Sequence, residues 1–366
     1  MTANPMTEPA VLTPRALNRA LLSRQLLLER ERRPVVATVE HLVGVQAQTP
    51  TDPYFGLNAR LEAFDPAELV TALTDKRVAR MSLQRSTIHL ATAEDCVAMR
   101  PVVQVVHDRA LQGNFGRHVE GLDLDEVAAA GRELLEDGPL VFSELGRWLA
   151  ERWPGREPLA LAMVVRTRVA LVQPPPRGLW GASGRALHSP LESWLQRPLG
   201  PPIALEDMVL RYLAAFGPAS ANDVQTWCGL TRLRDVLERL RPRLAAFRDE
   251  RGAELFDLPD APRPDADTPA PPRFLPEFDN VLLSHADRTR IAPPGIGERI
   301  YQQHGHWYPL LIDGFLAGTW KLRKDGLAIE LANPLTADQE AAVREEAAQL
   351  LAFAAPKAAH DVRFLT

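Results

Sequence analysis

Apolar residues recur at helical spacing ahead of a Gly-Pro pair at two places in the chain. Over residues 205–216 the apolar positions lie three or four residues apart, which is the spacing of one buried helix face. Gly217 and Pro218 then end this helix. Gly138 and Pro139 occupy the corresponding positions at an offset of 79 residues (217 minus 138). The pattern predicts two copies of one structural unit.

Residues after each Gly-Pro pair extend the repeat at the same offset. The matched pairs are Glu144/Asp223, Leu145/Val224 and Trp148/Trp227. A hydroxyl residue, Ser143 or Ser220, is the predicted N-cap of the next helix. A further helix and a glycine-containing β-hairpin follow in each copy: helices 158–170 and 230–240, hairpins from 171 and from 245. This order is typical of a winged helix-turn-helix, a module that binds DNA or another protein.

A third, less regular copy precedes these two. Thr13-Pro14 is a helix start, and two more helices and a strand pair follow: helices 36–45 and 66–75, strands 78–83 and 86–91. After the proline-rich stretch 259–272 the pattern changes to short strands broken by Asp-Gly turns, with a helix over 336–354 and a last strand over 360–365. We predict an α+β fold of three tandem winged helix-turn-helix modules and a small β-rich C-terminal domain. The domain boundaries are 1–92, 93–200, 201–272 and 273–366.

Composition limits the partners. The 366 residues carry 42 basic and 47 acidic side chains, a net charge of −5, so contact with nucleic acid must come from a local basic patch. Cys96 and Cys228 have no metal-binding spacing and form no disulfide framework, which fits a reducing cytoplasm. No apolar run has the length of a signal peptide or a membrane span, so we expect a cytoplasmic protein without a membrane partner.

The most informative polar motif is Gln46-Ala47-Gln48, which lies between a short amphipathic stretch and a turn containing Pro50 and Pro53. The two prolines are predicted to end any helix here. Residues two apart point to the same side only in extended or irregular backbone, where both amides would converge on one water molecule. A solvated helix end is the alternative for this pair.

Further motifs accompany the glutamines in a fixed order along nearly the whole chain. They are Pro53-Tyr54, Arg85-Ser86-Thr87-Ile88-His89-Leu90, Pro175-Pro176-Arg177-Gly178-Leu179-Trp180-Gly181, Leu275-Pro276-Glu277-Phe278-Asp279-Asn280 and Ser284-His285-Ala286-Asp287-Arg288. Together they resemble the winged-helix DNA glycosylase superfamily of AlkZ- and YcaQ-like proteins. Gln46 and Gln48 match the Gln-x-Gln motif of the AlkZ-like branch, with the small Ala47 where the family has an aliphatic residue.

The resemblance implies that the C-terminal domain is β-barrel-like and that the protein is a C-shaped monomer holding duplex DNA in a concave channel. It implies hydrolysis of the N-glycosidic bond of alkylated purines, with Gln46 and Gln48 as the catalytic residues. The Gln-x-Gln branch implies bulky 7-alkylguanine adducts or interstrand crosslinks as substrates, in DNA repair or antibiotic self-resistance. No cofactor or metal is implied.

A glutamine amide cannot accept a proton near neutral pH, so the substrate must supply the driving force. A guanine alkylated at its imidazole nitrogen is cationic and leaves without protonation, through an oxocarbenium-like sugar. The amide oxygens of Gln46 and Gln48 then need only orient a water and direct negative dipoles at the sugar. No lysine lies beside the glutamines, so we expect a monofunctional enzyme that leaves an abasic site uncut.

Six residues are candidates for DNA contact: Arg85, His89, Arg177, Trp180, Arg232 and Arg239. Each has a structural alternative. A lone strand histidine is more often buried, and the alternative for Trp180 is packing at a hairpin base. The helix arginines can pair with glutamate, as Arg234 can with Glu238. The charged residues of 277–288 are predicted to form a salt-bridge network between domains. The rival function is a tandem winged-helix transcription regulator without catalysis.

Overall fold

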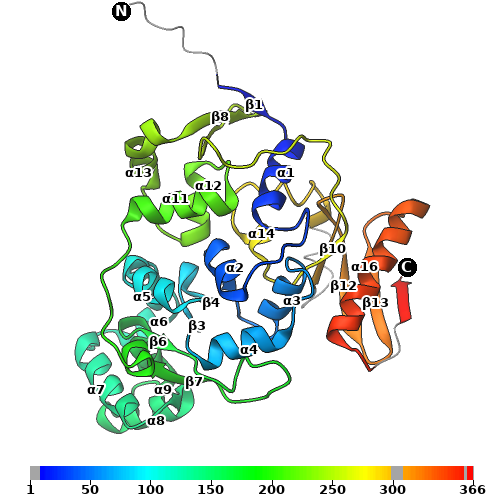
Figure 1. The fold of residues 1–366 in the computed structure, drawn as a ribbon. Coiled ribbons are helices and arrows are strands. Elements are labelled where there is room, and N and C mark those ends of the chain that lie inside the picture. The colour runs from blue at the N-terminus through cyan, green and yellow to red at the C-terminus, as the bar shows by residue number, and fades with distance from the viewer. Residues whose placement is uncertain (1–8, 298–307, 358–360, 366) are drawn as a thin grey trace, which may run out of the picture.

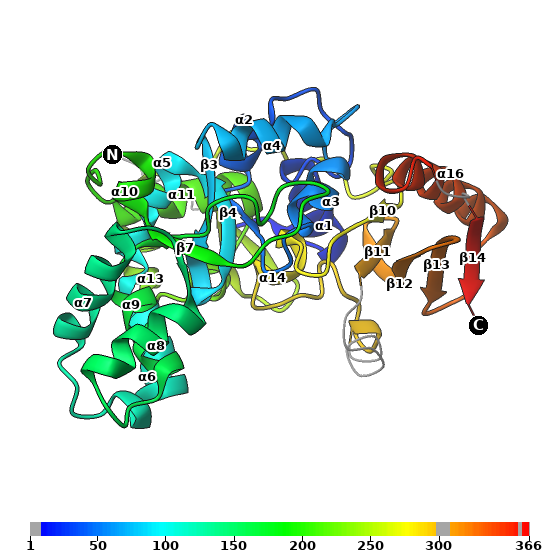
Figure 2. The ribbon, with the colours of Figure 1, turned by 90° about the horizontal axis from the view of Figure 1, so that it is seen from below.

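The computed structural model describes residues 9–297, 308–357 and 361–365, which form a mixed α+β fold. Helices α7, α8 and α9 gather at one end, α11, α12 and α13 at a second, and the C-terminal sheet with α16 at a third (Figure 1). The view from below shows α1, α3 and α14 between these groups (Figure 2). Within the described parts of the chain, no helix combines the length and apolarity that crossing a bilayer needs.

The N-terminal helices carry the predicted first module. Their bounds are α1 Pro14–Arg24, α2 Val35–His41, α3 Asp52–Asn58 and α4 Pro66–Thr74. Thr13 caps α1 as predicted, because its hydroxyl accepts a bond from Ala16 N at 3.1 Å. The predicted helix 36–45 is too long, since Val43 (φ +55°) and Gly44 (φ +82°) turn the chain out of helix after α2. Helix α3 was not predicted: Pro53 lies in its first turn, where a missing N–H costs no bond.

A six-stranded sheet joins the predicted first and second modules. Its order is β2 (Val45–Gln46), β4 (Ile88–Thr92), β3 (Val78–Ser82), β6 (Leu171–Val172), β7 (Leu187–Pro190) and β5 (Leu140–Val141). The pairing of β3 with β4 confirms the first predicted hairpin. One antiparallel pair, Met81 with Val172, joins β3 to β6. The glutamine-bearing strand β2 is therefore at one edge of a sheet shared by both modules.

The repeat predicted at an offset of 79 residues has a structural counterpart. The helices of the two copies are α7 (Leu124–Glu136), α8 (Phe142–Arg152) and α9 (Pro158–Arg168), then α11 (Leu205–Phe216), α12 (Ala221–Cys228) and α13 (Leu233–Leu240). In the first copy Leu140 of β5 pairs with His188 of β7. In the second, Ala219 pairs with Phe256 of β9 (Glu254–Asp257), and 219 minus 140 is again 79. In both copies, the short segment between the first two helices therefore pairs with the second strand of the hairpin.

The predicted helix caps differ between the copies. Ser220 caps α12 in a reciprocal capping box with Asp223, as predicted. The prediction for Ser143 is wrong. Helix α8 begins at Phe142, so Ser143 is the second residue of the helix and not its cap. The residue at the cap position, Val141, has no side-chain oxygen to bond the exposed N–H groups.

The C-terminal strands form an open sheet. Its order is β10 (Arg273–Phe274), β11 (Tyr308–Ile312), β12 (Phe315–Arg323), β13 (Gly326–Leu331) and β14 (Asp361–Leu365). The predicted barrel is wrong for the described residues. After α16 (Ala337–Ala354) the chain returns parallel to β13, so β14 extends the sheet at the edge opposite β10 instead of closing it. The apolar side of α16 packs on this sheet through Val343, Ala347 and Leu350.

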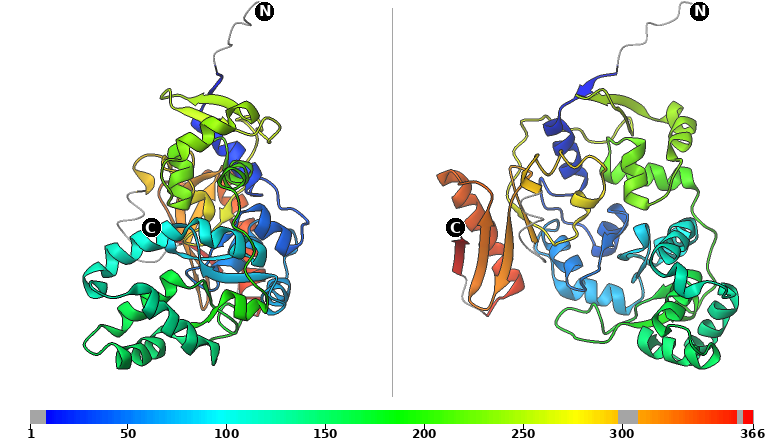
Figure 3. Two further views of the ribbon diagram at one scale, coloured as in Figure 1. Left: turned by 90° about the vertical axis from the view of Figure 1, so that its left-hand side faces the viewer. Right: turned by 180° about the vertical axis from the view of Figure 1, so that it is seen from behind.

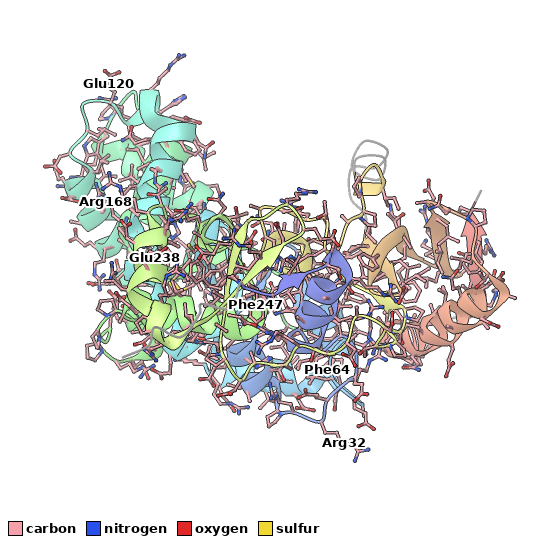
Figure 4. The ribbon with its side chains drawn as sticks, turned by 90° about the horizontal axis from the view of Figure 1, so that it is seen from above. Arg32, Phe64, Glu120, Arg168, Glu238 and Phe247 are labelled. Carbon is pink, nitrogen blue, oxygen red and sulfur yellow. The ribbon has the colours of Figure 1, made fainter. Side chains whose placement is uncertain are left out.

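The largest apolar core crosses the predicted module boundaries. It includes Leu21 of α1, Phe216 of α11, Trp227 of α12 and Leu311 of β11. At the far end, β1 (Val11–Leu12) runs parallel to β8 (Ala245–Asp249), visible in both views of Figure 3. A second core belongs to α7–α9, with Leu111 and Val119 of α6 (Gln104–Val119). Charged side chains such as Arg32 and Glu120 project outwards (Figure 4). The glutamine strand packs in a separate core, in which Val45 and Ala47 lie with Val39 of α2 and Tyr54 of α3.

Candidate active site

Strand β2 ends at Gln46, and Gln48 lies at a bend two residues further along the chain. Gln46 pairs with His89 of β4, and Ala47 N donates to Ile88 O at 2.8 Å, so the pairing with β4 continues one residue past the strand. The convergence of both amides on one water molecule stays a prediction. Ala47 is fully buried, whereas Gln48 is exposed and Gln46 retains 8% exposure.

The two amides are held differently. Gln46 Oε1 accepts a hydrogen bond from Arg85 Nη2 at 2.9 Å. Gln48 Oε1 accepts from Ile88 N at 3.4 Å, a long contact for an N–H donor. No described residue accepts a bond from Nε2 of either side chain. Each oxygen keeps a second lone pair, so the predicted water site is compatible with both contacts.

Arg85 is at the tip of the β3–β4 hairpin, in the turn η1 (Gln84–Ser86). Arg85 has φ +55° and Ser86 has φ +59°, so two successive residues without glycine adopt the left-handed region. The turn is closed by Leu83 N to Thr87 O and Thr87 N to Gln84 O, each 3.1 Å. Such residues cost roughly 1–3 kcal/mol each and persist where their surroundings impose them.

Helices of the second and third predicted modules surround this tip. Arg85 Nη1 donates to the backbone oxygen of Trp227 in α12. Ser86 Oγ lies 3.0 Å from His107 Nδ1 in α6. Arg166 Nη2 of α9 donates to Ser82 Oγ and to Ser86 O, both at 2.9 Å. The hairpin that carries Arg85 is thus contacted by three helices, and Arg85 itself by α12.

Burial keeps the histidines of this region neutral. It lowers the pKa of His89 to about 3 and the pKa of His107 to about 2, with Arg85 and Arg100 adding repulsion. His89 Nδ1 lies 2.9 Å from Thr87 O, so this nitrogen carries the proton and donates. Burial also lowers the pKa of Arg85 to about 10, with repulsion from Arg288. None of these groups changes protonation near pH 7.

Asp52 is the described group beside the motif that titrates near neutrality. Burial raises its pKa to about 7, and the negative charges of Glu277 and Asp279 add to the shift. Tyr308 OH donates to Asp52 Oδ1 at 3.3 Å. The side chain is 1% exposed, at the first turn of α3.

Two more of the predicted DNA contacts, Arg177 and Trp180, make contacts within the protein. Trp180 packs into an aromatic cluster, with ring centroids 4.9 Å from Tyr54 and 5.1 Å from Phe353. Arg177 Nη1 donates to Gly184 O at 3.2 Å within the same glycine-rich loop. These contacts give both residues a structural role. DNA contact by His89, Arg177 and Trp180 stays a prediction.

The arginines of α13 are exposed, as expected for a helix with one buried face. Arg232 precedes the helix at φ +63°. Arg239 pairs with Glu206 at 2.6 Å, and Arg234 pairs with Glu238 at 3.9 Å, the i,i+4 pair that the sequence predicts. DNA contact by Arg232 and Arg239 also stays a prediction. Arg109, which sequence reasoning missed, donates to Gly229 O at 3.2 Å beside the hairpin tip.

The charged residues of 277–288 join separate parts of the chain, as predicted. Asp279 makes two 2.8 Å bonds to Arg60 in the interior, and Asp287 pairs with Arg251 at 3.1 Å. His285 Nε2 lies 3.1 Å from Phe216 O. Over the described ranges, no three His, Cys, Asp or Glu side chains are grouped for a metal ion.

Comparison with known proteins defines the class. The family model "DNA glycosylase AlkZ-like" matches residues 39–353. The chain therefore belongs to the AlkZ-like DNA glycosylase family, which confirms the resemblance of its motifs. It is similar in fold to Streptomyces sahachiroi DNA glycosylase AlkZ, with a TM-score of 0.78 and 20% identity over 97% of this chain and 100% of that one. No curated protein matches the sequence.

Proposed function

We propose that this DNA glycosylase hydrolyses the N-glycosidic bond of bulky 7-alkylguanine adducts, using Gln46 and Gln48 and leaving an uncut abasic site. The observation that carries the proposal is that both amides contact the β3–β4 hairpin, Gln46 through Arg85 and Gln48 through Ile88 N, where Arg85 and His89 do not titrate near pH 7. A site of this kind suits a leaving group that needs no proton.

The reaction follows from the charge of the lesion. In a 7-alkylguanine the C1′–N9 bond breaks with its electron pair moving into the cationic ring, so the base departs neutral. Amide dipoles held by the protein orient the attacking water without reorganising during the step. Unmodified guanine is a poor leaving group and gains little from such a site, which restricts the enzyme to damaged bases.

Duplex DNA is the proposed partner of a monomer, with three winged-helix modules and the C-terminal domain arranged as a C around a channel. Gln48 is exposed, and the cations Arg109 and Arg288 lie beside the hairpin tip that carries Arg85, which supports DNA contact on this side. A net charge of −5 makes such a local group necessary. An open channel suits a bulky or crosslinked base that cannot be flipped easily into a pocket.

The test is base release from defined duplexes. The full-length protein is incubated with DNA that carries one 7-methylguanine or one bulky 7-alkylguanine, and free base is quantified by mass spectrometry. We expect release from both, faster for the bulky adduct, with strand breaks only after alkali. Tight duplex binding without release from any adduct would favour the transcription regulator instead. Strand breaks without alkali would contradict the monofunctional assignment.

A further inference from the structure

Gln46 and Gln48 are separated by one residue, yet the protein holds their amides unequally. Gln46 is nearly buried and bonded to a guanidinium, whereas Gln48 is exposed and has one long backbone contact. We propose that Arg85 is a positioning residue that makes Gln46 a hydrogen-bond donor to the departing base and leaves Gln48 to hold the water. This division of labour rests on the proposed glycosylase function.

Arg85 decides which end of the Gln46 amide faces outwards. A guanidinium has donors only, so the atom 2.9 Å from Arg85 Nη2 must be the amide oxygen. The NH₂ group is then on the other side of the amide carbon, with no acceptor among the described residues. Hydrogen-bonded groups polarise one another, so a guanidinium on the oxygen strengthens the outward N–H donors.

The hairpin tip and its neighbours prevent Arg85 from turning away. A second nitrogen of its guanidinium is bonded to Trp227 O, and its backbone is in the left-handed region. Gly229, at φ +83°, brings the turn between α12 and α13 against the tip. A Cβ there would lie 2.9 Å from Val106 Cγ1 and 3.5 Å from Arg85 Cα. The amide of Gln46 is therefore fixed before DNA arrives.

Gln48 has the freedom that a water ligand needs. Its contact with Ile88 N is 3.4 Å, beyond the usual N–H···O range of 2.7–3.2 Å, so its oxygen is weakly occupied. Its side chain is exposed, and solvent reaches it directly. A water held by this oxygen keeps its own oxygen free to attack the sugar.

The donor role matches the electron flow at the base. When C1′–N9 breaks, the electron pair enters the purine and raises the negative charge on its acceptor atoms, N3 and O6. An N–H donor fixed beside one of them stabilises the departing base more in the transition state than in the substrate. Water adds to C1′, its surplus proton passes to solvent, and neutral 7-alkylguanine leaves.

The substitution Gln46→Glu tests the donor role of the Gln46 NH₂ group. The carboxylate still accepts from Arg85, so the hairpin contact remains, but no N–H faces outwards. If Gln46 were a water acceptor, Gln46→Glu would retain or raise activity. We expect the single-turnover rate of 7-methylguanine release to fall roughly 100-fold or more, with the melting temperature unchanged or higher.

Arg85→Met tests the positioning role, with Arg166→Met as its matched control. Arg166 supports the same hairpin through Ser82 and Ser86 but does not touch Gln46. We expect Arg85→Met to lower the maximal single-turnover rate about 10- to 100-fold while the half-saturating DNA concentration stays within about threefold. Arg166→Met weakens the hairpin tip but keeps the bond between Arg85 and Gln46, so it should lower the maximal rate by a smaller factor than Arg85→Met.

The outcomes separate the two levels of the proposal. If the wild-type protein releases 7-methylguanine and Gln46→Glu releases it equally fast, the division of labour is wrong. The proposed glycosylase function would then still stand. Equal rate losses in Arg85→Met and Arg166→Met make Arg85 a hairpin support only. A rise in half-saturating DNA without a change in maximal rate makes Arg85 a DNA contact. A wild-type protein that releases no base overturns the proposed function itself.

Discussion

Two β-hairpins of this protein carry an arginine at the tip and differ in how the tip is built. The β8–β9 hairpin turns at Arg251 and Gly252, both exposed, and Gly252 adopts φ +82°. The β3–β4 hairpin turns at Arg85 and Ser86, both left-handed without glycine, between α6, α9 and α12. Local sequence accounts for the first turn, whereas the second depends on contacts from the rest of the fold.

The contrast shows where this fold accepts backbone strain. At the β8–β9 tip, Asp249 Oδ1 accepts bonds from Arg251 N at 3.0 Å and Ala253 N at 2.7 Å, and glycine meets the conformational demand. At the β3–β4 tip the unfavourable conformation is maintained by bonds that also hold Gln46. Strained backbone that over-determined contacts maintain is typical of functional sites.

The largest effect should come from the residues that the strained tip supports. Replacing Gln46 and Gln48 together by alanine removes both amides and should lower base release at least roughly 1,000-fold. Affinity for the adduct duplex should change less than about threefold, because neither side chain is a charged phosphate contact. Single-turnover release and fluorescence anisotropy measure the two quantities. A parallel loss of affinity would mean that the glutamines position DNA.

Two glycines with nearly the same φ angle allow the surroundings of the two hairpins to be compared directly. Gly229 (φ +83°) borders the buried tip, and Gly252 (φ +82°) forms the exposed one. An added Cβ at Gly252 meets no described atom within 4 Å, whereas at Gly229 it meets Val106 at 2.9 Å. We expect Gly252→Ala to lose about 1 kcal/mol of unfolding free energy and Gly229→Ala about 2–4 kcal/mol.

Gly229→Ala should also slow excision, since it displaces the tip that holds Gln46. Gly252→Ala should leave the excision rate unchanged. Chemical denaturation and single-turnover rates measure these differences. Equal stability losses in the two variants would show that the buried tip is no more constrained than the exposed one.

The buried carboxyl group of Asp52 should make the stability of the fold depend on pH. Its pKa is raised from 3.8 to about 7 in the folded protein, so the fold favours the protonated acid. As pH rises between these values the unfolded state loses its proton first, and the folded state is destabilised until the penalty is complete above pH 7. Asp52→Asn removes this penalty and should be stabilised by about 1–3 kcal/mol relative to wild type at pH 8. Its advantage should shrink towards pH 4, and an advantage independent of pH in thermal unfolding would exclude this carboxyl as the cause.

Arg251→Ala should have the smallest effect. The Arg251–Asp287 pair has side chains 69% and 41% exposed, and such pairs contribute about 0–1 kcal/mol. The melting temperature should change by less than about 2 °C, and any change should vanish in high salt. A loss comparable to that of Gly229→Ala would mean that the exposed tip depends on tertiary contacts after all.

The same two hairpins explain which features can be predicted from sequence. Asp-Gly and Arg-Gly turns, the 79-residue repeat and the Gln-x-Gln motif are local signals. Arg85 gives no such signal, because neither Arg85 nor Ser86 is a residue type that favours positive φ. The bond from Arg85 to Gln46 spans 39 residues and needs α12 in place. The open C-terminal sheet likewise depends on where β14 returns after α16, which no local pattern specifies.

The central claim is that a cationic base leaves unaided, so that fixed, uncharged amides are sufficient. The most direct measurement compares two duplexes that differ only in the charge of the lesion: 7-methylguanine, and its 7-deaza carbon analogue with the same methyl group. We predict release of the cationic base at least roughly 1,000-fold faster than that of the neutral analogue, with no release of unmodified guanine. Comparable release from both duplexes would contradict the account.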